Sequence, residues 1–163
     1  MVLFDNEVSR EEQYVRGKAG KGGWTMSTMT ARDFSSVVVP HDVRSASVAR
    51  HHLSRDMTSH RIDDDLAGDA ELLLSELVGN AVRHARPLPG GVVRVAWEVD
   101  TAEVVLRVTD GGSANGHRPH ESVVAADCVS GRGLAIVAAL AASWGVDATG
   151  GGQSVWAVLG RSA

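Results

Sequence analysis

One stretch, residues 71–84 (ELLLSELVGNAVRH), most constrains what this chain can fold into. Its apolar residues recur at helical spacing, which predicts an amphipathic α-helix with a broad buried face: Leu73, Leu74, Leu77, Val78, Ala81 and Val82. Glu76, Asn80 and His84 lie at i, i+4 and i+8, so they share one flank of that helix. A carboxylate, a carboxamide and an imidazole in a row form either a solvated face or part of a site. Motifs further along the chain favour a site.

The composition is that of a soluble protein with a single domain. With 163 residues, of which 44% are apolar and 22% are charged, the chain is long enough to bury a core. Its formal net charge of −4 gives no electrostatic support for a nucleic acid or an anionic membrane as partner. We therefore expect neither.

Cysteine use, hydropathy and the first residues indicate a cytoplasmic protein. Cys128 is the single cysteine, so no internal disulfide can form. No apolar run approaches the ~20 residues that a membrane helix needs, and acids stand near the start where a signal peptide needs basic residues. Lys18 and Lys21 are the only lysines, which excludes a P-loop lysine from the body of the chain.

The chain divides into two parts. Residues 1–32 mix charges and glycines without a sustained period, so we expect a disordered N-terminal extension, followed by one domain over residues 33–163. The domain opens with an edge strand over residues 34–39, which Pro40 stops. Asp42 is then expected to cap a helix that runs to about residue 57 and buries one apolar stripe: Val43, Ala46, Ala49, Leu53 and Met57.

Periodicity predicts the remaining elements. The central helix is expected over residues 65–85, and the acids at 63–65 complement its dipole rather than holding a cation. Two β-rich runs, 92–99 and 103–109, predict a hairpin that turns alternate residues inward: Val93, Val95 and Trp97. The last part predicts a lid loop over 111–133, a helix over 134–144 that Gly145 ends, and strands over 146–148 and 153–159.

Glycine-bearing motifs follow the central helix. Asp110 ends a strand before two glycines, where its carboxylate can accept a hydrogen bond from the amine of adenine; an ordinary Asp-Gly turn is the alternative. Gly111 and Gly112 let the backbone pass close to a purine because they lack a Cβ. Gly131 and Gly133 stand just before a helix, where free backbone amides and the helix dipole favour phosphate.

Two further side chains are candidates for contacts with a nucleotide. Arg132 can add a charged contact to the phosphates, or it can point to solvent. Ser154, in the last strand, is a candidate for a water-mediated contact with adenine. Together with the polar flank of the central helix, these motifs favour a nucleotide site.

In this order, the motifs resemble those of one superfamily. Residues 76–85 (ELVGNAVRHA) are similar to the N-box of the GHKL, or Bergerat-fold, ATPases, specifically the bacterial anti-sigma-factor serine kinases. Residues 108–112 (VTDGG) resemble their first glycine box, and residues 131–134 (GRGL) resemble their second. Residues 152–156 (GQSVW) resemble their closing strand, where a Thr or Ser near the adenine is usual.

The resemblance covers about residues 34–159 and implies a role for each motif. It implies that Asn80 holds Mg²⁺ against the triphosphate of ATP through its carboxamide oxygen, a ligand type that magnesium accepts. It implies that Glu76 is the general base that takes a proton from the attacking hydroxyl. His84 either orients a phosphate or packs beside Pro87. The implied nucleotide-binding residues are Asn80, His84, Asp110, Gly112, Gly131, Arg132, Gly133, Leu134 and Ser154.

The implied fold is an α/β two-layer sandwich, the Bergerat ATP-binding fold. It has a mixed, mostly antiparallel sheet with about three helices on one face, and ATP lies between the helices and a lid. The implied function is that of an anti-sigma-factor-like serine kinase, a homodimer that binds Mg·ATP, sequesters a sigma factor and phosphorylates a serine of an anti-anti-sigma (STAS-type) protein. Two alternatives stay open: an ATP-responsive partner-switching regulator with negligible kinase activity, and an interaction domain that binds no nucleotide.

Overall fold

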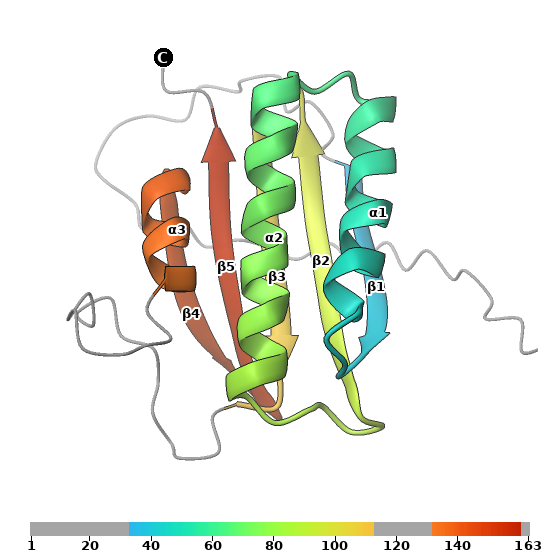
Figure 1. Ribbon diagram of the computed structural model, residues 1–163, viewed down its shortest axis with the longest axis vertical. Coiled ribbons are helices and arrows are strands. Elements are labelled where there is room, and N and C mark those ends of the chain that lie inside the picture. The colour runs from blue at the N-terminus through green and yellow to red at the C-terminus, as the bar shows by residue number, and fades with distance from the viewer. Residues whose placement is uncertain (1–32, 113–131, 161–163) are drawn as a thin grey trace, which may run out of the picture.

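The computed structural model describes residues 33–112 and 132–160 (Figure 1). The extension expected over residues 1–32 and most of the lid predicted over residues 111–133 lie outside the described residues, as do the side chains of Arg132 and Leu134. The described elements are, in chain order, β1 (Asp33–Pro40), α1 (Ser45–Ser59), α2 (Asp64–His84), β2 (Val92–Asp100), β3 (Glu103–Asp110), α3 (Arg132–Leu140), β4 (Ser143–Thr149) and β5 (Gly152–Gly160).

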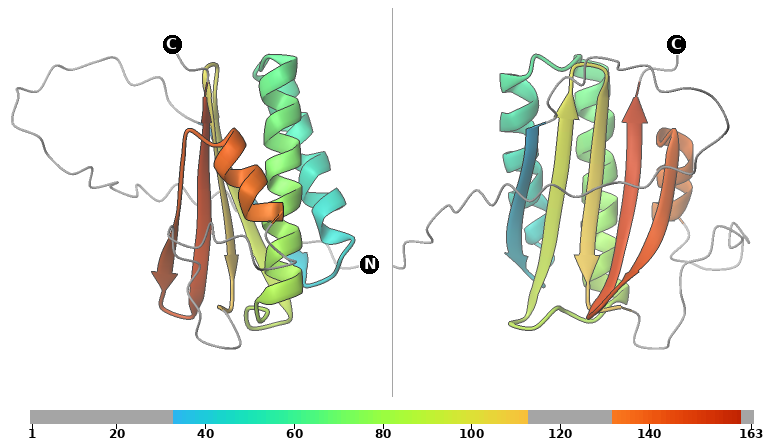
Figure 2. Two further views of the ribbon diagram at one scale, coloured as in Figure 1. Left: turned by 60° about the vertical axis from the view of Figure 1, so that its left-hand side comes forward. Right: turned by 180° about the vertical axis from the view of Figure 1, so that it is seen from behind.

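The strands form one five-stranded sheet in the order β1-β2-β3-β5-β4, and all four pairings are antiparallel. The three helices cover one face of this sheet (Figure 2). The α/β two-layer sandwich predicted from the sequence is therefore confirmed. None of the described helices is both long and apolar enough to cross a membrane.

The core lies between α2 and the middle of the sheet. The apolar face of α2 is buried as its spacing predicts, from Leu66 through Ala81. Alternate residues of β2 and β3 meet it: Val93, Val95, Trp97, Val99, Val104, Leu106 and Val108. Each large side chain buried here contributes roughly 1.5–3 kcal/mol, so α2 is firmly fixed against β3. The polar flank of α2 is held in place with it.

The start of α2 confirms the capping interpretation of the acids before it. Asp63 stands at the N-cap, and its side chain accepts a hydrogen bond from the backbone N–H of Asp65 at 3.1 Å. Asp64 and Asp65 occupy the first turn, where carboxylates are favoured by the helix dipole. The acids at 63–65 therefore begin a helix.

The start of α1 differs from the prediction. The helix begins at Ser45, and Asp42 does not cap it, because the Asp42 side chain accepts instead from the backbone N–H of Arg44 at 2.9 Å. The Asp42 carbonyl accepts from the N–H of Ser45 at 3.0 Å, which closes a turn before the helix. Val43 lies in this turn and is 77% exposed, so it does not belong to the buried stripe.

The end of α3 also differs from the prediction. The helix stops at Leu140, and both Trp144 and Gly145 belong to β4. Gly145 pairs with Trp156 of β5, and a Cβ on Gly145 would lie 2.7 Å from Cζ2 of the indole. Glycine is needed at this position because the Trp156 ring lies against its backbone, not because a helix ends there.

Candidate functional site

Glu76 and Asn80 lie side by side on the flank of α2, as their spacing predicts, and both are half-buried. Arg83 joins them: its Nη2 atom lies 3.4 Å from Asn80 Oδ1 and 3.9 Å from Glu76 Oε2. The guanidinium passes over Gly79, where a Cβ would lie 3.0 Å from Nη2. Arg83 was not identified as a site residue from the sequence, although its i+3 spacing from Asn80 could have shown it.

The first turn of α3 lies against this flank, and Figure 2 shows that end of α3 approaching α2. Gly133 is buried, and a Cβ built on it would lie 2.9 Å from Asn80 Nδ2 and 3.0 Å from Glu76 Oε2. Two predicted motifs that are far apart in the sequence therefore meet at these three residues. Gly131 lies outside the described residues, and so do the side chains of Arg132 and Leu134, so the roles predicted for these three residues stay predictions.

Asp110 is the buried carboxylate of the site. It is 2% exposed at the end of β3 and lies on the face of the sheet that the helices cover. Its Oδ1 atom accepts a hydrogen bond from the N–H of Gly112 at 2.8 Å, and its side chain is hydrogen-bonded to Gln153. Burial raises the pKa of Asp110, and these two hydrogen bonds and the charge of His41 counteract that rise.

The two glycines after Asp110 are needed for the conformation and the close packing of the backbone. Gly112 has a φ of +81°, which favours glycine. Gly111 donates its N–H to the carbonyl of Arg86 at 2.7 Å, and Arg86 donates to the carbonyl of Gly112 at 2.9 Å. A Cβ on Gly111 would collide with the carbonyl oxygens of Arg86 and Pro87. The close approach that requires Gly111 is thus to the segment after α2, whereas the sequence interpretation assigned it to a purine.

Ser154 does not lie with Asp110. Its hydroxyl is 2.6 Å from that of Thr109, the residue before Asp110, and consecutive residues of a strand point to opposite faces. Gln153 is the β5 residue paired with Asp110, and it shares the helix-covered face. Sequence reasoning missed Gln153. Whether Gln153 or Ser154 lies beside Asp110 depends on the register of β5 against β3, and a shift of one residue would exchange the two.

His84 lies exposed at the end of α2, one turn beyond Asn80. The two roles suggested for His84 stay predictions. Among the described residues, no group of three or more His, Cys, Asp or Glu side chains could hold a metal ion. His117 and His120, which the lid sequence contains, lie outside that description.

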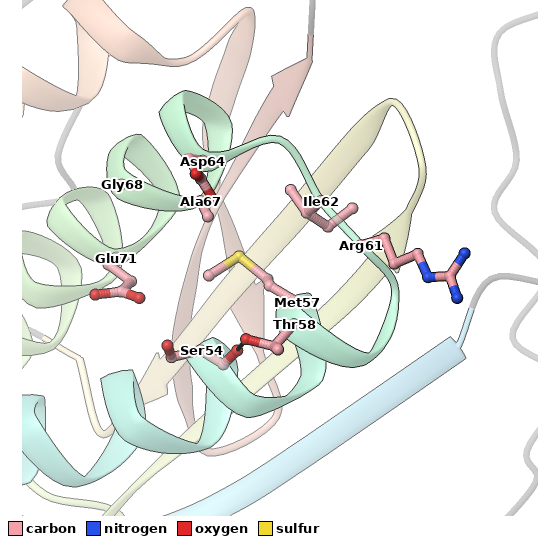
Figure 3. Close-up of a pocket in the computed structure, with 9 residues that line it drawn as sticks. All are labelled: Ser54, Met57, Thr58, Arg61, Ile62, Asp64, Ala67, Gly68 and Glu71. Carbon is pink, nitrogen blue, oxygen red and sulfur yellow. Dashed lines mark hydrogen bonds between the residues drawn. The ribbon is translucent and has the colours of Figure 1, made fainter.

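A pocket of about 450 Å³ lies elsewhere, between α1 and α2 (Figure 3). It contains none of the predicted site residues. Its lining comes from the end of α1, the connection to α2 and the first turns of α2: Ser54, Met57, Thr58, Arg61, Ile62, Asp64, Ala67, Gly68 and Glu71. The polar flank with Asn80 and the carboxylate of Asp110 therefore remain the candidate site.

A family model described as a histidine kinase-like ATPase domain matches residues 39–159, which include α2, Asp110, α3 and all of β5 but its last residue. No curated protein matches the chain significantly.

One similar solved structure contains the RsbU and RsbW domains of Rv1364c from Mycobacterium tuberculosis. The two chains superpose with a TM-score of 0.59 at 20% sequence identity, over 80% of this chain and 34% of that one. This chain thus spans about a third of the other, and at this identity the likeness concerns the fold.

Proposed function

The chain belongs to the histidine kinase-like ATPase family, and on that premise we propose that it is an ATP-binding, anti-sigma-factor-like serine kinase. In this proposal it sequesters a sigma factor in the cytoplasm and phosphorylates a serine of an anti-anti-sigma protein. The observation that carries the proposal is the junction of Gly133 with Glu76 and Asn80. There the start of one helix meets the polar flank of another.

That junction supports phosphate binding for a physical reason. The first turn of an α-helix carries backbone N–H groups without intrahelical partners and the positive end of the dipole. In α3 this turn lies directly against the Asn80 carboxamide and the Glu76 carboxylate. The absence of a Cβ at Gly133 keeps the two helices close enough for one triphosphate to contact both.

The residues at this junction fit a magnesium ion as well. Asn80 offers an amide oxygen, which is a hard ligand of the kind that Mg²⁺ takes together with phosphate and water oxygens. Bound there, the ion would neutralise charge on the triphosphate. Arg83 adds positive charge on the same flank, which favours the triphosphate, and its Nη2 atom lies 3.4 Å from the Asn80 Oδ1 that the ion would take.

Asp110 and Glu76 have separate tasks in the proposed reaction. The buried carboxylate of Asp110 accepts a hydrogen bond from the exocyclic amine of adenine, which guanine lacks at that position. Glu76 accepts the proton of the serine hydroxyl while the oxygen attacks the γ-phosphorus and the bond to ADP breaks. The phosphoserine adds negative charge to the partner, which weakens its rebinding.

The partners in the proposal derive from the motifs and from the likeness to a chain that carries an RsbW domain. A sigma factor and a STAS-type anti-anti-sigma protein would compete for the kinase. We also propose a homodimer. It is supported by β1, an end strand of the sheet that exposes 62% of Phe34 and 57% of Val38.

Arg83 favours a second candidate, an ATP-responsive partner-switching regulator with negligible kinase activity. Its guanidinium lies 3.9 Å from Glu76 Oε2 and so competes for the oxygen that would accept the proton. If this ion pair persists when ATP is bound, Glu76 is a poor base. ATP would then alter partner binding without phosphotransfer.

Incubation of the protein with γ-labelled Mg·ATP and an anti-anti-sigma protein separates the two candidates. The kinase predicts label on a serine of the partner, lost in Glu76→Ala while ATP affinity stays within about twofold. Glu71→Ala is the matched control, since Glu71 lies on the same helix but lines the separate pocket. An ATP-sensitive complex without label would support the regulator, and a wild-type protein that does not bind ATP would contradict both.

A further inference from the structure

His41 connects segments that surround Asp110. It follows the last residue of β1, is half-buried, and its Nε2 atom lies 3.2 Å from the carbonyl oxygen of Ala81 and 3.1 Å from that of Ala85. Its backbone N–H donates to the carbonyl of Gly91 at 2.9 Å. One residue thus holds the end of α2 and the turn before β2.

The two carbonyls differ in their need for a donor: that of Ala81 already accepts from the N–H of Ala85 at 3.1 Å, whereas that of Ala85 lies beyond the helix. Ala85 is the C-cap residue in an extended conformation, so its carbonyl has left the helical hydrogen-bonding pattern. The last turn of a helix carries partial negative charge, which an imidazole N–H complements. His41 therefore fixes the direction in which the chain leaves α2.

That direction determines where Asp110 is held. The next residue, Arg86, forms the two backbone hydrogen bonds to Gly111 and Gly112. Gly112 in turn donates to Asp110 Oδ1 at 2.8 Å. A continuous series of hydrogen bonds thus runs from the imidazole of His41, through the end of α2, to the carboxylate.

We propose that His41 is a positioning residue for recognition of the nucleotide base, because it holds the end of α2 against the Asp110–Gly112 turn. The proposal rests on the ATP-binding function proposed above. It concerns the base alone, since Glu76, Asn80 and Gly133 lie on the flank of α2 and α3 and take no part in this series of hydrogen bonds. The loss of the imidazole donor should weaken adenine binding and spare phosphate binding.

The test compares His41→Phe, which keeps a ring without a donor, with His41→Gln, whose amide can donate to the same carbonyls. Calorimetry measures the affinity of each variant for ATP and for inorganic tripolyphosphate. We expect His41→Phe to lower ATP affinity about tenfold and tripolyphosphate affinity less than twofold. His41→Gln should restore most of the ATP affinity, and His52→Phe, at an exposed position of α1, should leave both affinities unchanged.

Three other results are informative. Equal ATP affinity in wild type and His41→Phe would overturn this inference and leave the proposed function intact. An equal loss of ATP and tripolyphosphate affinity in His41→Phe would also overturn it, because the residue would then support the whole site and not the base. A wild-type protein that binds no ATP would overturn the proposed function itself.

Discussion

Gly133 of α3 and Asn80 of α2 touch: a methyl group added to the glycine would lie 2.9 Å from Nδ2 and 3.0 Å from Oδ1 of the carboxamide. Glu76 Oε2 is equally close to that position, at 3.0 Å. The contact joins the polar flank of the central helix to the first turn of α3, a helix that follows β2 and β3 in the chain.

Gly133→Ala should therefore disturb the site without unfolding the protein. The new methyl group displaces the Asn80 and Glu76 side chains, because real Cβ contacts are longer than 3.0 Å. We expect an affinity loss for Mg·ATP of about tenfold or more, equivalent to ~1.4 kcal/mol. Calorimetric titration measures it.

Gly68→Ala is the control for this substitution. Gly68 is also a helical glycine, but nothing lies within 4 Å of the added Cβ. ATP affinity should not change, and the free energy of unfolding should rise by about 0.5–1 kcal/mol, since alanine favours a helix more than glycine does. Equal effects of the two substitutions on affinity would show that the Gly133–Asn80 contact is unimportant.

Asp110 should make stability depend on pH. Its folded-state pKa is raised by burial, so the folded protein holds the proton more tightly than the unfolded chain and loses stability as pH rises through that pKa. Asp110→Asn keeps the acceptor for the Gly112 N–H and removes the buried charge. The variant should be more stable than wild type at pH 7.

The stability difference between Asp110→Asn and wild type should shrink as pH falls through the raised pKa and should become constant below the ordinary value of 3.8. Urea unfolding between pH 7 and pH 3.5 follows it. A difference that stays constant over this range would mean that Asp110 titrates alike in the folded and unfolded states.

Gly145 should be intolerant of any side chain. A Cβ there would lie 2.7 Å from Cζ2 and 2.9 Å from Cε2 of Trp156, both in the rigid part of the ring. Gly145→Ala should lower the free energy of unfolding by about 1–3 kcal/mol, as overpacking does. Adding Trp156→Leu should cost less in Gly145→Ala than in wild type, because in the variant the second substitution also relieves the clash. Additive costs in urea unfolding would refute this contact.

The helical and strand spacing of apolar residues in the sequence predicts most of this fold. The apolar stripe of α2 and the alternation of apolar residues in β2 were sufficient to predict these two elements, because both patterns reflect burial against one core. The start of α1 was misjudged because a side chain such as Asp42 can cap a helix or close a turn, and the choice depends on where β1 ends. The end of α3 was misjudged because Trp144 fits a helical spacing. In the structure Trp144 and Gly145 belong to a strand, because Gly145 pairs with Trp156 of β5.

The site was predictable where it depends on one helix and less so where it depends on pairing. Glu76 and Asn80 share a flank by spacing alone. The choice between Gln153 and Ser154 required the register of β5 against β3. His41 could not be found at all from the sequence, because its partners are backbone carbonyls of residues in α2 and its C-cap.

The central claim is that a nucleotide with an adenine base binds between the polar flank of α2 and the carboxylate of Asp110. Calorimetric titration of the wild-type protein and Asp110→Ala with Mg·ATP and Mg·GTP tests it most directly. We predict binding of ATP by the wild type, much weaker binding of GTP, and loss of ATP binding in Asp110→Ala. No heat with ATP for the wild type, or equal ATP affinity in the two proteins, would contradict the claim.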